Sequence, residues 1–364
     1  MVVSQFVLYL ILLSYFVLVA VLSRYFSMPG RFSFWSEPND DSAPITVIVP
    51  FKNESENLPH LLGSLDDALR NHQNAEVLFV DDHGTDDGRQ LVETFGNEFF
   101  TIVNNEGNGK KAAIETGVKK ANNDLIFLTD ADCVLPEKLF DLNTGNGHEN
   151  IVVCGAVIVE NGRGIAAAFQ HIESLVLVFL AGSCIKAGIP LTGSAAHLFF
   201  SKKGFEALNP FDGNRDISSG DDHYFIQKAA ADSSFKILWN ESPYPVITRP
   251  QLSLNGLIRQ KARWASKLKA KGGIIPVLAG FYLLVVQSAF LTSVILGFVY
   301  SGVVFPALAL GKVLTDIMLF MKPKKHYKSK VSLLAVCFAA LVYPLYFVVV
   351  LVAALGRNPK SKHK

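Results

Sequence analysis

A short apolar segment that ends in two carboxylates constrains the fold more than any other part of this 364-residue chain. Residues 125–128 read Leu-Ile-Phe-Leu, and Asp130 and Asp132 follow after Thr129. A continuous apolar run of this length is typical of a strand buried on both faces of a parallel sheet. Ligands of open α/β sheets bind beyond the carboxyl ends of such strands. The pattern predicts that both aspartates bind one hard cation, Mg²⁺ or Mn²⁺, that carries a diphosphate; the alternative is a solvated acidic turn.

Composition excludes several classes of protein. The formal net charge of +2 argues against a nucleic-acid-binding surface. The four cysteines are far apart and form neither a metal-ligand pattern nor a C-x-x-C pair, so we expect reduced thiols in a cytosolic domain. Half of the residues are hydrophobic, and the excess lies at the two ends of the chain.

The N-terminal end reads as a membrane anchor, here assigned to residues 1–24. Residues 6–22 are apolar except for Ser14, which with the flanking residues is long enough to cross a bilayer. A cleaved signal peptide is the alternative, but no basic residue precedes the run and no small-x-small site follows it. Arg24 and Arg31 come after the run, which predicts an outer N-terminus and a cytoplasmic continuation.

The C-terminal region, residues 273–356, contains two or three further spans. Residues 274–300 and 331–355 are each long enough to cross. Residues 303–321 are apolar but contain Lys312 and Asp316, which can pair at i, i+4 on a helix. If this segment crosses, the basic run 322–330 is cytoplasmic and the basic tail 357–364 is outside; if it does not, the two exchange sides. The five lysines of the run slightly favour the first arrangement.

The middle of the chain, residues 44–250, alternates short apolar runs with helical patterns, which predicts an α/β fold with a mostly parallel sheet. Strands are expected at residues 45–50, 76–80, 99–103, 125–128 and 151–159. Ser55 is expected to cap the helix that follows the first strand. Residues 166–189 are also apolar, but Gln170, His171 and Glu173 interrupt them, so a helix packed in the protein or at the membrane surface is expected rather than a span. His171 is expected to be a packing residue rather than a ligand.

Charged turns follow three of the expected strands and suggest a nucleotide site. Asp81 and Asp82 end the second strand, Lys110 and Lys111 open a helix after a glycine-rich turn, and Asp130 ends the fourth strand. A carboxylate can bind a base or ribose, and a lysine can approach phosphate. Taken singly, the acidic pair could cap a helix and the lysines could be a solvated helix end.

These segments resemble the nucleotide-binding half of family-2 glycosyltransferases of the GT-A fold. The resemblance spans about residues 46–266 and is carried by residues 47–54, 80–86, Gly109-Lys110 and Asp130-Ala-Asp132. It implies that Asp81 holds the base and that Asp130 and Asp132 hold the metal and the sugar diphosphate. The donor-binding residues that we expect are Pro50, Glu54, Asp81, Asp82, Lys110 and Asp130.

Two later motifs extend the resemblance. Asp221-Asp222 is similar to the family's acidic pair, in which the second member is the general base; aspartate stands at 221 where glutamate is more usual. An ordinary helix cap is the alternative. Gln260, Arg263 and Trp264 resemble the Q-x-x-R-W element of membrane-bound members, within an amphipathic segment at 251–272. An arginine can contact a diphosphate and an indole can stack on a sugar, but a helix whose basic residues meet lipid headgroups is also consistent with this pattern.

The resemblance implies inverting, metal-dependent transfer of a sugar (a hexosyltransferase of EC class 2.4) from a nucleotide-diphosphate sugar to a membrane lipid or lipid-linked acceptor. Asp222 is the expected base, Asp221, Gln260, Arg263 and Trp264 are expected at the acceptor and diphosphate, and Mg²⁺ or Mn²⁺ is the expected cofactor. A processive polysaccharide synthase and a non-catalytic membrane scaffold are the alternatives. The expected location is a bacterial inner membrane with the catalytic domain in the cytoplasm.

Overall fold

A computed structural model describes residues 2–29, 44–70, 72, 74–141, 150–162, 164–215, 217, 220–271, 274–300 and 302–356. Arg31 and the basic tail 357–364 lie outside these residues. The chain divides into two compact units. An α/β unit is formed by residues 29–160 and 188–249, and a helical unit by residues 1–28, 161–187 and 250–359.

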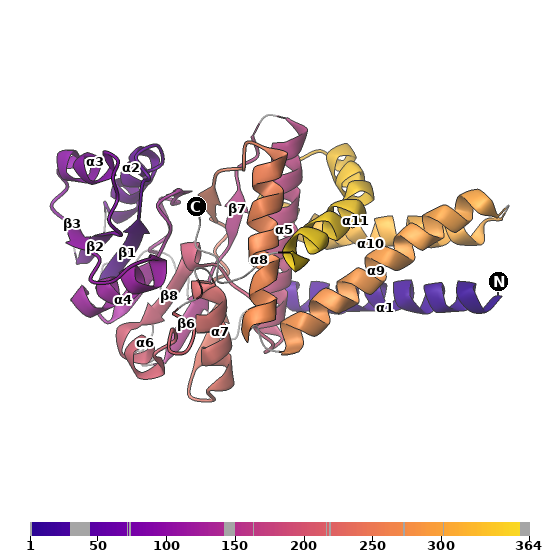
Figure 1. Ribbon diagram of the computed structural model, residues 1–364, viewed down its shortest axis with the longest axis horizontal. Coiled ribbons are helices and arrows are strands. Elements are labelled where there is room, and N and C mark those ends of the chain that lie inside the picture. The colour runs from indigo at the N-terminus through magenta and orange to yellow at the C-terminus, as the bar shows by residue number, and fades with distance from the viewer. Residues whose placement is uncertain are drawn as a thin grey trace. The chain divides into compact units, whose positions relative to one another are not determined.

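The α/β unit is built on a seven-stranded sheet (Figure 1). Its strands, in spatial order, are β3 (Phe100–Asn104), β2 (Ala75–Asp81), β1 (Ile45–Phe51), β4 (Leu125–Leu128), β8 (Leu198–Ser201), β6 (Ile151–Cys154) and β9 (Lys236–Trp239). β8 runs antiparallel to both of its neighbours, whereas the remaining pairs are parallel. The predicted α/β fold with a mostly parallel sheet is confirmed.

Helices bury both faces of the first strands, which is why these strands are apolar without alternation. Val47 and Val49 belong to a core that includes Leu58, Leu61, Leu62 and Leu65 of α2 (Leu58–Leu69). On α4 (Lys110–Lys120), Gly117 lies so close to β1 that an added Cβ would be 2.6 Å from Cγ2 of Ile48. α3 (Gly88–Phe95) contacts both α2 and β3.

The single strand expected at residues 151–159 is instead two strands in different sheets. β6 ends at Cys154, and β7 (Val157–Val159) joins a three-stranded sheet with β10 (Val246–Thr248) and β5 (Cys133–Val134). The chain leaves the large sheet at Gly155, where a Cβ would lie 2.2 Å from Nε2 of His197. Only glycine lets the backbone pass this close to the buried imidazole ring, and the chain crosses from one sheet to the other there instead of continuing as one strand.

Three further helices, one of them a 3₁₀ helix, belong to the α/β unit. The 3₁₀ helix η1 (Ala195–His197) leads into β8, and α6 (Lys202–Leu208) follows it. α7 (Asp221–Ala231) begins at the acidic pair, directly after Gly220, whose φ of 88° is in the left-handed region. Glycine tolerates this conformation without strain, which explains its place before the helix.

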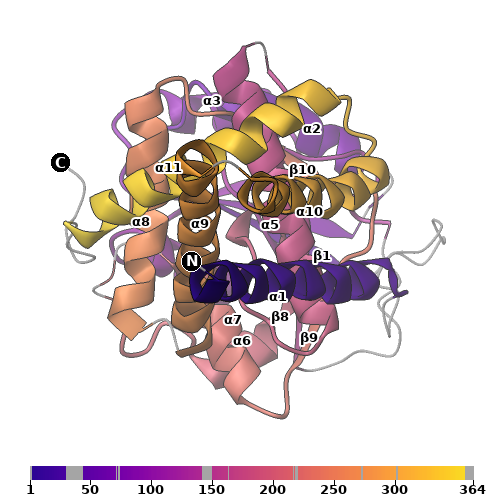
Figure 2. The same ribbon diagram turned by 90° about the vertical axis from the view of Figure 1, so that its right-hand side faces the viewer.

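The helical unit contains six helices, among the residues that the structure describes (Figures 1 and 2). They are α1 (Val2–Ser27), α5 (Ile165–Lys186), α8 (Leu254–Lys271), α9 (Ile274–Val299), α10 (Val304–His326) and α11 (Leu333–Leu355). By length and composition all except α8 could cross a membrane. α5 differs from the other four because 61% of its most apolar window is buried, against 22–28% in the others. This agrees with the expectation of a packed helix, although its composition also suits a span.

Polar contacts join α10 to α1 inside this unit. Nζ of Lys312 lies 2.5 Å from Oδ2 of Asp316, so the predicted i, i+4 pair is confirmed. The hydroxyl of Tyr15 donates to Oδ1 of the same aspartate at 2.8 Å. Lys312 is fully buried and its ammonium also lies over the ring of Phe290. A charge in an apolar bundle is tolerated only with such partners.

Candidate active site

The expected donor-binding residues follow strand ends that lie at one edge of the sheet. Phe51, the last residue of β1, is in register with Asp81, the last residue of β2, which in turn is in register with Asn104. β4 is parallel to β1 and ends two residues before Asp130. Because parallel strands present their carboxyl ends together, the turns after them share one side of the α/β unit.

Lys110 connects two acidic segments that are about ninety residues apart in sequence. Its Nζ lies 2.5 Å from Oδ1 of Asp130 and 3.1 Å from Oδ2 of Asp221. Lys110 is the first residue of α4 and follows Gly109, whose φ is 87°. Burial opposes the charged form of Lys110, but the carboxylates of Asp130 and Asp221 outweigh it and raise the pKa of the ammonium. Three of the predicted site residues therefore meet directly.

Two more carboxylates, Glu54 and Asp132, lie in the turns that follow β1 and β4. Burial raises the pKa of Glu54, the hydrogen bond from Asn57 opposes this, and the charges of Asp132 and Asp130 raise the pKa further. Burial also raises the pKa of Asp130, partly offset by Lys110. Asp132 is exposed, and the hydroxyl of Thr248 on β10 donates to its Oδ2 at 3.5 Å.

Asp81 and Asp82 are buried and bind the turns of the site edge. Oδ1 of Asp81 accepts a hydrogen bond from the amide of Gly84 at 2.8 Å, and its Oδ2 lies 3.7 Å from Nη1 of Arg89. Oδ1 of Asp82 accepts from the amide of Gly109 at 2.7 Å and from Asn105 at 2.6 Å. Asp82 thus holds the turn that presents Lys110, and donor binding by both aspartates remains a prediction.

Asp221 and Asp222 are the first residues of α7, where the helix dipole stabilises negative charge. Oδ1 of Asp222 accepts from the amide of His223 at 2.7 Å. The carboxylate of Asp222 is close enough to Lys110 to favour its ammonium form. The N-cap of α7 is Gly220, and no side chain caps the helix, so the expected alternative of a capping aspartate is wrong for Asp222. Its place in the first turn is compatible with the role of a base.

The predicted metal ligands fit a substrate-carrying cation better than a self-contained metal site. Among the described residues, no group of three or more His, Cys, Asp or Glu side chains could hold a metal ion. Mg²⁺ is commonly held by one or two carboxylates together with substrate phosphates and water. The donor set of Asp130 and Asp132 fits such a cation, with the remaining positions left for diphosphate oxygens.

Gln260, Arg263 and Trp264 belong to α8 in the helical unit, as the amphipathic pattern suggested. Trp264 is 40% exposed, and the ammonium of Lys261 lies 4.3 Å from its ring centroid. Pro50 lies within buried β1, paired with Val80. Participation of these four residues in substrate binding stays a prediction.

Sequence reasoning missed three residues that support this edge. Arg89 lies beside Asp81 and donates to Asn104 at 2.7 Å, and its place just after the acidic turn could have indicated this. Thr248 and the buried His197 come from distant segments that carry no sequence signal.

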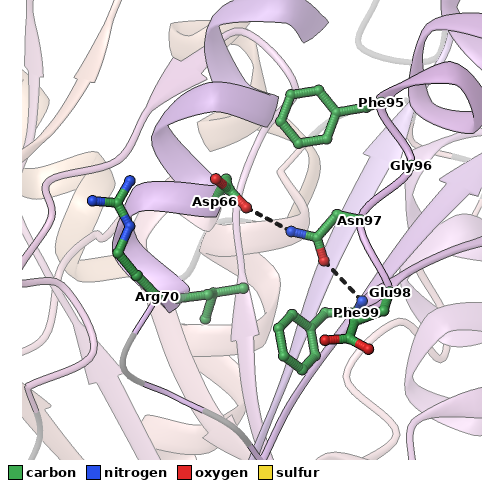
Figure 3. Close-up of a pocket in the computed structure, with 8 residues that line it drawn as sticks. Asp66, Arg70, Phe95, Gly96, Asn97, Glu98 and Phe99 are labelled. Atoms are coloured by element: carbon green, nitrogen blue, oxygen red, sulfur yellow. Dashed lines mark hydrogen bonds between the residues drawn. The ribbon is translucent and has the colours of Figure 1, made fainter.

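A surface hollow of about 700 Å³ lies elsewhere, between α2 and the loop from α3 to β3 (Figure 3). Asn97 spans it, donating to Asp66 at 2.6 Å, and Arg70 and Phe95 line its rim. Because β3 starts directly after Phe99, this hollow is at the amino end of the strands. It is therefore not the place where strand-end carboxylates gather.

Comparisons with known proteins show which proteins this chain resembles. Residues 46–176 match the family model described as Glycosyl transferase family 2. The chain is 25% identical over 198 residues to Glycosyltransferase AglE of Haloferax volcanii, covering 53% of this chain. It is 23% identical over 270 residues to Poly-beta-1,6-N-acetyl-D-glucosamine synthase of Staphylococcus aureus, covering 71% of this chain. In both cases the match spans 63% of the relative's length.

A solved structure resembles nearly the whole chain. It is the mannosyltransferase PcManGT of Pyrobaculum calidifontis in complex with GDP-Man and Mn²⁺, with a TM-score of 0.55, 16% sequence identity, and coverage of 97% of this chain and 98% of that one. This likeness shows the fold. Residues 46–176 therefore resemble a glycosyl transferase family 2 domain, and the chain has a GT-A-like fold. The acidic pair at Asp221 lies beyond the residues that the family model matches.

Proposed function

We propose that this protein is an inverting, metal-dependent glycosyltransferase that moves a sugar from a nucleotide-diphosphate sugar to a membrane-lipid or lipid-linked acceptor. The observation that carries the proposal is the convergence of Asp130 and Asp221 on Lys110, at the strand-end edge of a family 2 domain. Carboxylates that lie close together repel one another and destabilise the fold. A non-catalytic scaffold would gain nothing from bringing them together.

Some of the site residues act on the sugar donor and others on the acceptor. Asp222 accepts the proton of the acceptor hydroxyl as that oxygen attacks the anomeric carbon and the bond to the diphosphate breaks. Lys110, which is paired with Asp130 and Asp221, would turn from these carboxylates to the departing diphosphate. Asp81 and Asp82 contact the base and ribose, Glu54 and Pro50 shape the donor side, and Asp221 holds Lys110 in place.

A divalent cation, Mg²⁺ or Mn²⁺, would be held by Asp130 and Asp132. It would neutralise charge on the diphosphate as the leaving group departs. The electrostatics of this chain support the need for it, because Glu54 and the aspartates outnumber Lys110 and would repel a bare diphosphate. The solved relative that shares the fold is described with GDP-Man and Mn²⁺.

The acceptor is proposed to be lipid-borne because apolar helices flank the catalytic unit in sequence. Arg263 and Trp264 of α8 would contact the diphosphate and the acceptor sugar or lipid headgroup, and Gln260 would orient them. A processive polysaccharide synthase is the second candidate. It is favoured by the similarity to the Poly-beta-1,6-N-acetyl-D-glucosamine synthase.

The proposed location is a bacterial inner membrane with the α/β unit in the cytoplasm. Contacts between α1 and α10 support it, because they progress in the same direction along both helices. Tyr15 binds Asp316, Ser23 and Ser27 bind Lys322, and the ring of Phe26 lies near that of His326. The two helices are thus parallel, so the basic run after Lys322 lies at the end of α1 that carries Arg24. Both basic segments would face the cytoplasm, with α10 as a span.

The decisive experiment is a screen of nucleotide sugars with purified protein in lipid vesicles, with and without Mg²⁺ or Mn²⁺. Released nucleotide and lipid-extractable label are measured together. A single new glycolipid that forms only with metal supports the proposal, whereas a ladder of products supports the processive synthase. Donor binding without any transfer or hydrolysis would leave only the scaffold.

A further inference from the structure

The polar residues that interrupt α5 each bind a different segment of the helical unit. Gln170, His171 and Glu173 are 3%, 7% and 7% exposed, within a helix that is otherwise largely apolar. Burying polar groups in such a helix is unfavourable unless each finds a partner. Their partners therefore indicate why these three polar residues are present in an apolar helix.

Two of the three contacts fix connecting segments. Oε1 of Gln170 accepts from the amide of Gln251 at 2.8 Å, and its Nε2 donates to the carbonyl of the same residue at 3.0 Å. This reciprocal pair holds the chain three residues before α8 begins. His171 bonds to the hydroxyl of Ser329 at 2.7 Å, between α10 and α11.

The third contact reaches the Q-x-x-R-W helix itself. Oε2 of Glu173 lies 2.7 Å from Nζ of Lys261, and only 7% and 10% of the two side chains are exposed. Lys261 is one of the two variable positions of the motif. The same ammonium lies 4.3 Å from the ring centroid of Trp264, which is three residues further along α8. A lysine that is free to move would extend its ammonium to water, so the carboxylate of Glu173 keeps the charge over the indole.

We propose that Glu173 and Lys261 are positioning residues that set the orientation of Trp264, and of the motif that it belongs to, for transfer to the acceptor. This inference rests on the proposed function, since it assigns Trp264 to the acceptor side. Glu173 acts through Lys261, and neither is assigned to the reacting atoms. The pair also fixes the rotation of α8 about its axis, because a buried ion pair tolerates little displacement.

The orientation of Trp264 can be tested without any activity. The full-length protein is labelled with 5-fluorotryptophan in detergent micelles, and the ¹⁹F resonance of Trp264 is assigned by its loss in Trp264→Phe. Glu173→Gln and Lys261→Met are expected to shift or broaden this resonance while leaving that of Trp239, in β9, unchanged. Lys261→Arg, which keeps a cation in reach of both partners, is expected to restore most of the wild-type signal.

His171→Asn is the matched control. It removes another buried polar contact of the same helix, but its partner Ser329 is not on α8. The Trp264 resonance should then stay as in the wild type. If Glu173→Gln leaves the resonance unchanged, or if His171→Asn changes it equally, Glu173 is not a positioning residue.

Kinetics provide the second readout. With vesicle-borne lipid acceptor and the donor found active in the screen, Glu173→Gln and Lys261→Met should lower kcat about tenfold or more. The Kd of the nucleotide alone should change much less than kcat, because all of its proposed contacts except that of Arg263 are in the α/β unit. A shifted resonance with wild-type kcat would overturn the role in transfer. Failure of the wild type to transfer any sugar would refute the proposed function instead, while the resonance arm still decides the contact.

Discussion

At the scale of single residues, two adjacent lysines in the first turn of α4 have different roles. Lys110 reaches Asp130 and Asp221 at the candidate site. Lys111 is buried, and its ammonium donates to the backbone carbonyl and the side-chain oxygen of Asn214, both at 2.7 Å. It also lies 4.6 Å from the ring centroid of Tyr224 on α7. Because α7 begins with the acidic pair, Lys111 holds the segment that presents Asp221 and Asp222.

Lys111→Met should therefore destabilise the protein, since the oxygens of Asn214 would be left buried without this donor. We expect a loss of about 1–3 kcal/mol in the free energy of unfolding. Transfer activity should fall as well, because α7 is no longer held. Denaturant titration and initial rates measure the two effects. Lys119→Met, at a mostly exposed lysine of the same helix, is the control and should change neither by much.

Asp222→Asn tests the base directly. The amide keeps an oxygen that can bind the end of α7, so the fold should persist, while proton acceptance is lost. We expect transfer to fall about 10²–10⁴-fold, with nucleotide affinity retained. Rates and nucleotide binding by calorimetry are to be compared. Full activity in this variant would show that another group takes the proton.

At the scale of elements, small residues decide how closely helices approach the sheet. Gly117 on α4 has no room for a side chain against Ile48, whereas nothing lies within 4 Å of a Cβ added at Gly63 on α2. Gly117→Ala should cost about 1–3 kcal/mol through overpacking. Gly63→Ala should instead stabilise by up to about 1 kcal/mol, because alanine favours the helix. Opposite changes in Tm check this pair of expectations.

A buried imidazole links the strands β8, β6 and β9. Nδ1 of His197 donates to the carbonyl of Ala156 at 2.9 Å, and Nε2 accepts from the amide nitrogen of Asn240 at 3.2 Å. The oxygen of Asn240 accepts from the amide of Ser242, so its nitrogen must face the histidine. The ring is thereby held neutral, and burial lowers the pKa of His197 to about 4.

This predicts an acid-sensitive fold. Between the ordinary histidine pKa of 6.5 and the value of about 4, the unfolded chain binds the proton and the folded chain does not. The contribution of His197 to the free energy of unfolding is therefore complete above pH 6.5. It falls by about 3 kcal/mol in total as the pH is lowered to 4. Denaturation followed by Trp239 fluorescence measures the slope. His197→Asn should flatten this part of the profile, while a variant of the exposed His60 should retain it.

At the scale of the whole molecule, the parallel packing of α1 and α10 predicts the sidedness of the loops. Gly302→Cys, between α9 and α10, and Lys330→Cys, between α10 and α11, should lie on opposite sides of the membrane. A membrane-impermeant maleimide added to intact cells should label the first, and the second only after permeabilisation. Equal labelling of both before permeabilisation would exclude α10 as a span.

Much of the site could be predicted because its residues belong to short segments of recognisable sequence. Asp130 and Asp132 follow an apolar strand, and Lys110 follows a glycine-rich turn, so residue type and strand-end position sufficed. Ser55 was expected to cap α2, but the helix begins after Asn57, and the amide of Ser55 donates to Asp86 instead. Asp86, from the turn after β2, binds the backbone of Ser55, and a pattern of neighbouring residues cannot predict such a distant partner.

The sequence by itself determined the α/β alternation, the apolar terminal segments and the carboxylates at strand ends, because these depend on hydrophobic periodicity and on residues close together in the chain. Tertiary structure decided that residues 151–159 divide between two sheets at Gly155, that Lys111 is buried, and that the interruptions of α5 are partners of distant segments. These outcomes depend on which side chains meet across long separations. Burial and pairing of polar groups there are fixed by packing and not by local pattern.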